Sequence, residues 1–214
     1  MAEKPPGQSL LENAYQLSTP SDNKSYYRDF APTYDTDFAQ QLGWHYPQAI
    51  ADAYHRAATP PDLPIADIGC GTGYVAAKLG LPADQIDGID ISPEMLAIAR
   101  TKSLYRALHE LDLTGPLDAL SGQYGAVLSA GTFTHGHLGP GPLANLLHIA
   151  RPGALFIIGV NQEHFTQRQF AETLDALQNA GKISPYRTDV TRMYSNPGHA
   201  HSEDRALILH YRKL

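Results

Sequence analysis

Residues 65–76 combine a short apolar run, three glycines at alternate positions and the start of a helical pattern. The glycines are Gly69, Gly71 and Gly73. Because glycine has no Cβ, the backbone at these positions can turn tightly and approach a bound molecule where a side chain would collide with it. The segment therefore predicts a strand, a ligand-cradling loop and a helix in succession, which is a unit of α/β folds.

Short apolar runs and helical patterns alternate along the chain after residue 61. The predicted strands of this region are residues 65–69, 86–91, 106–111, 126–130 and 154–160. The predicted helices between them are residues 74–80, 93–102, 116–120 and 142–150. Such alternation favours right-handed crossovers and a parallel sheet with helices on both faces.

The C-terminal part follows a different pattern. An amphipathic helix is predicted over residues 165–180, followed by two strands over 183–194 and 205–214 that a polar turn, 195–198, would join. Two strands linked by a turn of Ser, Asn, Pro and Gly indicate a hairpin and hence one antiparallel strand. The sequence therefore predicts an α/β fold with a doubly wound, mostly parallel seven-stranded sheet and a C-terminal antiparallel hairpin strand.

The length of 214 residues fits one domain, since single cores stop growing only beyond roughly 250 residues. Residues 1–22 are rich in Pro, Gly, Ser and Asn and lack periodicity, so they predict a flexible N-terminal tail. Residues 23–214 are predicted to form the domain, in which 23–60 are a helical lead-in or lid. Aromatic residues at helical spacing mark this lead-in, and packing onto the sheet is the alternative explanation for them.

Composition excludes several classes of protein. Acidic residues outnumber basic ones by 22 to 16, which disfavours the phosphate attraction that non-specific nucleic-acid binding requires. The single cysteine, Cys70, cannot form an internal disulfide, and the N-terminus has no apolar signal run. No stretch approaches the roughly 20 apolar residues of a membrane span. We expect a cytoplasmic protein without membrane or nucleic-acid partners; its oligomeric state cannot be predicted from the sequence.

Three acidic residues stand at or near the ends of predicted strands: Asp67, Asp90 and Asp112. Asp67 would lie unpaired beside a pyrophosphate, whereas it suits a ligand that carries an ammonium group. Asp90 can accept hydrogen bonds from both hydroxyls of a ribose, and Asp112 can accept one from an adenine amino group. The glycines also satisfy a loose dinucleotide fingerprint, so an NAD(P)-dependent oxidoreductase is an alternative at this point.

The combination of these motifs resembles a known family. Residues 67–73, 89–96 and 111–113 are similar to the successive binding motifs of class I S-adenosylmethionine-dependent methyltransferases. Within that family the chain is most similar to the methyltransferase-like proteins of the Williams-Beuren syndrome region type, through residues 34–35, 44–47, 105–106, 131–138 and 151–155. The resemblance implies a Rossmann-like methyltransferase fold, with S-adenosylmethionine as cofactor and S-adenosylhomocysteine as product.

The resemblance also implies which residues bind the cofactor. Gly69, Gly71 and Gly73 would face its methionyl part, with Asp67 near the amino group. Asp90 would bind the ribose hydroxyls. These five residues all belong to the first two strands and the loops that follow them.

The rest of the implied cofactor site comes from several parts of the chain. The adenine would lie among residues that follow the second and third strands or the helix between them, namely Ile91, Met95, Asp112 and Leu113. Ser129 would lie near the sulfonium. Tyr27 and Tyr34 would close over the methionyl end, where a tyrosine face suits a cationic sulfur. Core packing is the alternative for both tyrosines.

Two histidines, His135 and His137, follow the fourth predicted strand in a glycine-rich loop. They lie at the sheet edge where doubly wound folds bind substrates, which makes them candidates for substrate contact or proton acceptance. Ordinary loop hydrogen bonds are the alternative. His164, His199 and His201 are expected around the same mouth, but these residues lack the helical i, i+4 spacing of a metal-ligand pair, so no metal site is predicted.

These observations together predict an enzyme. Its expected reaction is in-line transfer of a methyl group from S-adenosylmethionine to a small molecule or to an exposed protein side chain. No Asn-Pro-Pro-aromatic tetrapeptide follows the fourth strand, which makes nucleic-acid bases less favoured acceptors. An oxidoreductase that uses NAD(P), or a non-catalytic module that binds S-adenosylmethionine, are the alternatives.

Overall fold

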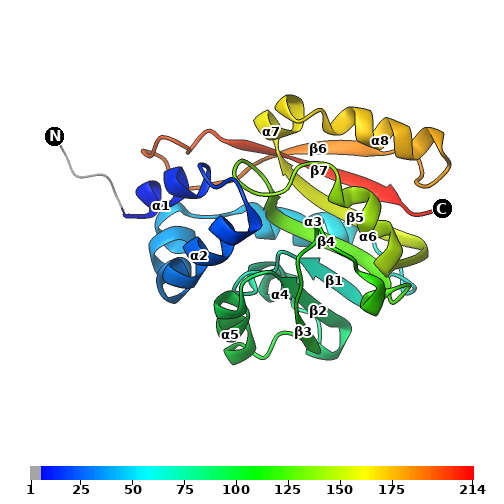
Figure 1. The fold of residues 1–214 in the computed structure, drawn as a ribbon, viewed down its shortest axis with the longest axis horizontal. Helices are drawn as coiled ribbons and strands as arrows, with labels where there is room; N and C mark the ends of the chain where they lie inside the picture. Colours follow the sequence, from blue (N-terminus) through cyan, green and yellow to red (C-terminus); the bar gives the residue numbers. More distant parts are fainter. Residues whose placement is uncertain (1–5) are drawn as a thin grey trace.

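The computed structural model describes residues 6–214. Its centre is a seven-stranded sheet with the strand order β3-β2-β1-β4-β5-β7-β6, flanked by helices (Figure 1). The strands are β1 (Ile65–Ile68), β2 (Ile86–Asp90), β3 (Ala107–Glu110), β4 (Tyr124–Phe133), β5 (Ala150–Asn161), β6 (Arg187–Arg192) and β7 (Arg205–Arg212). Only β7 runs antiparallel to its neighbours β5 and β6, and β1 to β5 pair in parallel. The predicted fold class is confirmed.

The central strands are apolar because the sheet is covered on both faces. All four residues of β1 are buried, as expected for a parallel strand between helical layers. One core cluster contains Ile50 of helix α3 (Tyr46–Ala57) and Val75 of helix α4 (Tyr74–Leu79). A second cluster contains Leu146 of helix α6 (Pro142–Ile149) and Leu174 of helix α8 (Phe170–Asn179). The sheet separates the two clusters.

Two predicted C-terminal elements differ from the structure in more than the position of their end residues. Residues 165–180 do not form one helix, because Gln169 has a left-handed φ of 55° that separates α7 (Gln162–Gln167) from α8. The connection between β6 and β7 spans residues 193–204 and is longer than the predicted turn, 195–198. It also pairs with the lead-in, because Trp44 bridges Tyr194 and Ser195 donates a hydrogen bond to the Gly43 carbonyl. These tertiary contacts have no local sequence pattern.

The structure corrects the prediction of a flexible N-terminal tail. Within residues 1–22, the described part contains helix α1 (Pro6–Ala14) and the start of helix α2 (Pro20–Phe30), while residues 1–5 lie outside the described residues. Leu11 is buried in the first core cluster, and the Tyr26 hydroxyl donates to the Leu10 carbonyl. Helix α2 begins with a capping box, in which Thr19 and Asp22 bond each other's backbone N–H. Apolar side chains of α1 therefore hold this segment against the core, although its composition is typical of a flexible tail.

Helix α2 packs near helix α5 (Pro93–Thr101), and α1 packs on the π-helical turn η2 (Tyr34–Gln40), which follows the 3₁₀ turn η1 (Ala31–Thr33). Figure 1 shows α1 and α2 together at one side of the sheet. Two further 3₁₀ turns are η3 (Ala83–Gln85) and η4 (Asp118–Leu120).

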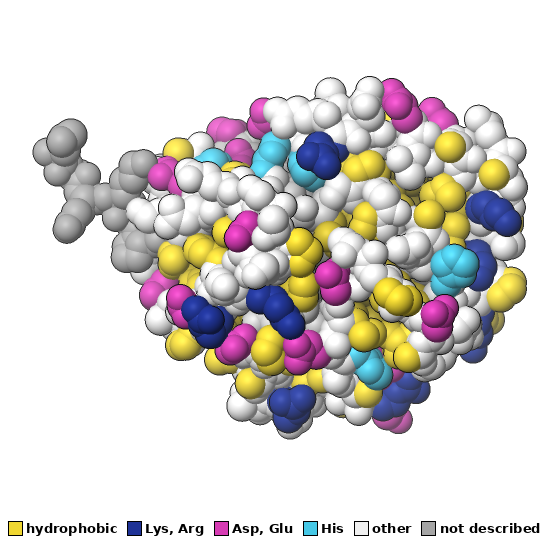
Figure 2. Space-filling model, viewed as in Figure 1, with side chains coloured by type: hydrophobic (Ala, Val, Ile, Leu, Met, Phe, Trp, Pro, Cys, Tyr) yellow, Lys and Arg dark blue, Asp and Glu magenta, His cyan; other side chains and the backbone are white. Residues whose placement is uncertain are grey.

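On the face shown in Figure 2, Lys and Arg side chains are scattered among acidic ones. No helix within residues 6–214 is long and apolar enough to cross a bilayer.

Candidate functional site

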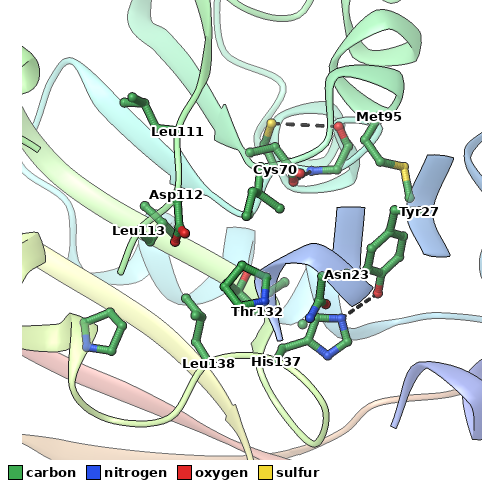
Figure 3. Close-up of a pocket in the computed structure, with 18 of the residues that line it drawn as sticks. Asn23, Tyr27, Cys70, Met95, Leu111, Asp112, Leu113, Thr132, His137 and Leu138 are labelled. Carbon is green, nitrogen blue, oxygen red and sulfur yellow. Dashed lines mark hydrogen bonds between the residues drawn. The ribbon is translucent and has the colours of Figure 1, made fainter. Parts of the chain in front are cut away.

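A cavity of about 300 Å³ lies at the carboxyl ends of β1 to β4. Open α/β sheets bind ligands at this edge. Helix α2 forms one wall, and the loops that follow the strands form the others (Figure 3). The predicted site residues that line it are Tyr27, Tyr34, Gly69, Gly71, Asp90, Ile91, Met95, Asp112, Leu113 and His137. The cavity therefore brings together residues from six separate stretches of the chain.

The glycine loop forms the floor of the cavity. Gly69 and Gly71 have φ angles of +62° and +53°, a conformation that L side chains rarely adopt. A Cβ at Gly69 would collide with the Thr132 side chain, whereas a Cβ at Gly71 would meet no atom within 4 Å. Gly69 is thus required by close packing, and Gly71 leaves open space for a ligand. Gly73 precedes α4 and does not line the cavity.

Asp90, at the end of β2, connects this loop to the next one. Its two carboxylate oxygens accept hydrogen bonds from the backbone N–H of Gly71 at 2.8 Å and of Ser92 at 2.9 Å. Burial raises the pKa of the Asp90 carboxyl, and these N–H groups oppose the rise. Each oxygen keeps a lone pair that can accept a further hydrogen bond from a molecule in the cavity.

An apolar slot lies beside Asp90. Ile91 and Met95 form one side, and Leu113 lies on the other, after β3. Asp112 stands at the edge of this slot, where one carboxylate oxygen accepts hydrogen bonds from the backbone N–H and the hydroxyl of Thr114. Its second oxygen makes no side-chain hydrogen bond with the described residues. The slot can hold a flat apolar group with a polar edge.

Two predicted cofactor residues lie beneath the cavity. Asp67 is fully buried and accepts a hydrogen bond from the Tyr105 hydroxyl at 2.7 Å, while its other oxygen has no partner among the described residues. Burial raises the pKa of Asp67 to about 7. The Ser129 hydroxyl donates to the Ile68 carbonyl at 2.9 Å. Neither side chain lines the cavity, so both support the glycine loop and strand from below.

Tyr27 and His137 form a hydrogen-bonded pair in the cavity wall. The Tyr27 hydroxyl lies 2.7 Å from His137 Nε2 (Figure 3). On the other side of the ring, His137 Nδ1 lies 2.9 Å from the His135 carbonyl. A carbonyl oxygen can only accept, so Nδ1 carries the proton. Burial lowers the pKa of His137, which favours the neutral ring. Nε2 is then an acceptor, and Tyr27 donates to it.

His135 lies outside the cavity lining. Its ring packs against Tyr15 and His164, with ring centroids 5.3 and 5.1 Å away. The His164 ring bonds the Leu138 carbonyl, and His199 packs against Tyr194. Within the described residues, no group of three or more His, Cys, Asp or Glu side chains could hold a metal ion. The structure therefore separates the two histidines that the sequence predicts together.

The cavity also contains residues that sequence reasoning missed. Asn23 of α2 is 9% exposed and donates from Nδ2 to the carbonyls of Thr19 and Gly136, both at 3.0 Å. Trp44 and Thr132 line the same wall. Thr132 follows the predicted fourth strand, 126–130, and stands next to a glycine, which is a usable signal, although in the structure it lies within β4. Asn23 has no such signal in the sequence, because helix α2 reaches the cavity only through tertiary packing.

Cys70 lines the cavity between two glycines of the loop. Burial raises the pKa of its thiol well above the ordinary value, so the thiol stays protonated. A protonated thiol is a poor nucleophile, so Cys70 fills space in the loop and has no catalytic role in this account.

Several known proteins resemble this chain in sequence. The methyltransferase-domain family matches residues 65–154. Human methyltransferase-like protein 27 is 35% identical over 163 residues, which cover 73% of this chain and 66% of that protein. The chain thus spans slightly less than two thirds of that relative's length.

Solved structures give the same architecture. The magnesium protoporphyrin IX methyltransferase of Synechocystis, determined with bound S-adenosylmethionine, superposes with a TM-score of 0.63 at 17% identity and covers 92% of this chain and 98% of that one. A possible histamine N-methyltransferase of Thermotoga maritima superposes with a TM-score of 0.58 at 15% identity, and the match covers 87% of this chain and 97% of that one. At such low identity these structures establish the fold alone.

Proposed function

We propose that this chain, which belongs to the class I S-adenosylmethionine-dependent methyltransferases, transfers a methyl group from S-adenosylmethionine to a small-molecule nucleophile. The observation that carries the proposal is the cavity in which the open face of Gly71, the Asp90 carboxylate and an apolar slot lie side by side. Family membership disfavours the NAD(P)-dependent oxidoreductase that the glycines alone leave open.

The residues present fit S-adenosylmethionine. Asp90 has free lone pairs for the ribose hydroxyls, and the slot of Ile91, Met95 and Leu113 suits the adenine, with Asp112 at its edge. The open space above Gly71 suits the methionyl part. In this proposal Asp67, Gly73 and Ser129 act indirectly by shaping the loop beneath the cofactor, and Gly69 acts by its close packing on Thr132.

When bound, S-adenosylmethionine supplies a methyl group on a positively charged sulfur. The chain's own contribution is to hold the acceptor in line with that methyl group and to exclude water, because orientation alone can lower a barrier by several kcal/mol. Tyr27 and Tyr34 line the cavity, and a tyrosine face suits a cationic sulfur. A desolvated cavity also favours the dispersal of charge during methyl transfer.

For an acceptor that carries a proton, we assign His137 as the proton acceptor. Its Nε2 is unprotonated and is reached through the Tyr27 hydroxyl. His135 is a positioning residue, because its carbonyl fixes the His137 tautomer. A Tyr27→Phe variant lacks the hydroxyl that bonds His137 Nε2, while the His135 carbonyl still holds His137 Nδ1. This variant therefore separates the loss of proton transfer from the loss of structure.

The acceptor and the surroundings of the protein are also proposals. Magnesium protoporphyrin IX methyltransferase acts, by its name, on a small molecule, which supports a small-molecule acceptor here. The excess of acidic residues argues against a nucleic-acid partner. We also propose a cytoplasmic location, because the single cysteine, Cys70, cannot form an internal disulfide.

The direct test uses S-adenosylmethionine with a labelled methyl group. The protein is incubated with this compound and a fraction of small metabolites, and the products are separated by chromatography. The proposal predicts enzyme-dependent transfer of the label to at least one metabolite. Binding of the cofactor without any transfer, to metabolites or to added proteins, would instead indicate a non-catalytic module.

A further inference from the structure

The charges around the cavity have one sign. Its charged lining residues are Asp90 and Asp112, and among the described residues that line it there is no Lys or Arg. Two lysines on neighbouring elements are held in ion pairs, Lys24 with Glu110 and Lys102 with Asp35. A carboxylate or phosphate on the methyl acceptor would therefore meet no cationic side chain in the wall. A cationic acceptor would meet a favourable field.

The hydrogen-bonding role of Tyr27 is fixed. Its single hydroxyl proton is donated to His137 Nε2, because the opposite ring nitrogen is committed to the His135 carbonyl. Tyr27 Oη therefore presents only lone pairs to the cavity. Any polar group of a ligand that binds to this oxygen must donate the hydrogen bond.

The role of Asn23 is fixed in the same way. Both hydrogens of its amide nitrogen are directed at carbonyl oxygens, those of Thr19 and Gly136, which cannot donate. This excludes the flipped amide, so Oδ1 is an acceptor, and it is buried with no partner among the described residues. A buried acceptor without a donor is costly and is a position at which a ligand can supply the missing hydrogen bond.

Asn23 and Tyr27 lie four residues apart on α2 and thus share one face of the helix. Figure 3 shows both side chains beside His137 in the same wall of the cavity. Tyr34 and Trp44 also line the cavity, and the ring centroid of Tyr34 lies 6.4 Å from that of Tyr27 and 6.0 Å from that of Trp44. Aromatic faces attract ammonium groups, and neither Asn23 nor Tyr27 can donate to a ligand. The wall is thus complementary to a cation that carries several N–H bonds.

We propose that the methyl acceptor is a small primary or secondary amine, which binds as an ammonium ion to Asn23 Oδ1 and Tyr27 Oη. This inference rests on the proposed methyl transfer and names the substrate class of that site. The ammonium first loses one proton to Tyr27 Oη while Tyr27 passes its own proton to His137 Nε2. The nitrogen lone pair then forms the bond to the methyl carbon, and the carbon–sulfur bond breaks with its electron pair left on sulfur. The imidazolium of His137 later releases its proton to solvent.

The first experiment measures binding to the protein saturated with S-adenosylhomocysteine. Two isosteric sets are titrated by calorimetry: phenethylamine, phenethyl alcohol and hydrocinnamate, then butylamine, butanol and valerate. We expect each amine to bind at least about tenfold more tightly than its alcohol and its acid, since hydrogen bonds to a charged donor are the stronger ones. Alcohols or acids that bind as tightly, or no binding by any of the six compounds, overturn the proposal.

The second experiment tests which ammonium group binds at Asn23 and Tyr27. This group could belong to the acceptor or to the amino acid part of the cofactor itself. Tyr27→Phe removes only the hydroxyl and keeps the aromatic face that the cofactor would contact. Tyr27→Phe and Asn23→Leu are therefore expected to weaken amine binding about tenfold and to leave the binding of S-adenosylhomocysteine, whose sulfur is uncharged, unchanged. Tyr26→Phe is the matched control, because that hydroxyl bonds the Leu10 carbonyl rather than the cavity. If the variants instead weaken S-adenosylhomocysteine but not methylthioadenosine, which lacks the amino acid, they bind the cofactor and the proposal is wrong.

The same data distinguish this proposal from the proposed function. If the unmodified protein does not bind S-adenosylhomocysteine, the methyltransferase assignment fails, and the amine proposal fails with it. If the protein binds S-adenosylhomocysteine and shows no preference for amines, only the amine proposal fails.

Discussion

Single residues in the cavity carry more than one duty. Asp90 holds the glycine loop through the Gly71 N–H and the next loop through the Ser92 N–H, and it also faces the cavity. Its position at a strand end beside the glycines could be predicted from the sequence. Its backbone bonds could not, because they depend on how two loops approach each other.

Gly71 allows a direct test of the open space above the loop. Gly71→Ala places a Cβ toward the cavity at a φ of +53° and should weaken S-adenosylhomocysteine binding. The strain of the left-handed conformation should also lower the free energy of unfolding by about 1–2 kcal/mol. Gly80→Ala is the matched control, since Gly80 has a φ of +62° and similarly open surroundings but lies after α4, outside the cavity lining. Equal binding by both variants would contradict the role of Gly71.

Asp67 makes the stability depend on pH. Its folded-state pKa of about 7 lies above its usual value, so between about pH 4 and pH 7 the folded state binds a proton that the unfolded state has lost. The free energy of unfolding should therefore fall as pH rises through this range, by at most about 1.4 kcal/mol per pH unit from this group. Below this range both states hold the proton, and above it neither does.

Denaturant unfolding of Asp67→Asn between pH 5 and pH 8 checks this effect. The variant keeps an acceptor for the Tyr105 hydroxyl but does not titrate. Its stability relative to the original chain should rise with pH across the range. A constant difference at all pH values would mean that Asp67 is ionised in the folded protein throughout.

At the scale of elements, the strands and the helices α4, α5 and α6 could be predicted because their signals are local. Apolar runs, glycines and a proline at the first turn mark their boundaries. The docked helix α1 and the break at Gln169 were missed for a physical reason. In both cases tertiary packing overrides local composition: α1 is held by contacts to η2, and α8 by the buried side chains of Phe170 and Leu174.

The break at Gln169 makes a prediction about stability. Because Gln169 has a φ of 55°, Gln169→Gly should raise the free energy of unfolding by up to about 1 kcal/mol. Gln178→Gly, within α8, should instead lower it by about 1 kcal/mol, since glycine is a poor helix former. Thermal or denaturant unfolding of the two variants compares the signs. A loss of stability in both would mean that Gln169 is not strained.

At the scale of the whole molecule, the sheet supplies one half of the site and the lead-in supplies the other. The glycine loop, Asp90 and Asp112 follow from the order of the strands, which places their ends at one edge. Asn23, Tyr27 and Trp44 arrive there from the N-terminal helices and the loop before α3. The sequence predicted the residues of the proposed cofactor half, and in the acceptor half it predicted Tyr27 and His137 as site residues. Asn23 and Trp44 were not predicted as site residues, because they reach the cavity through long-range packing.

The central claim is that S-adenosylmethionine binds across the glycine loop with its ribose on Asp90. Isothermal titration calorimetry with S-adenosylhomocysteine should give one site per chain, and NAD should give no heat. Asp90→Ala should weaken binding by about 1–3 kcal/mol through lost hydrogen bonds, while Asp84→Ala, at an exposed residue outside the cavity lining, should not. No heat with S-adenosylhomocysteine, or the same affinity in the Asp90→Ala variant, would contradict the account.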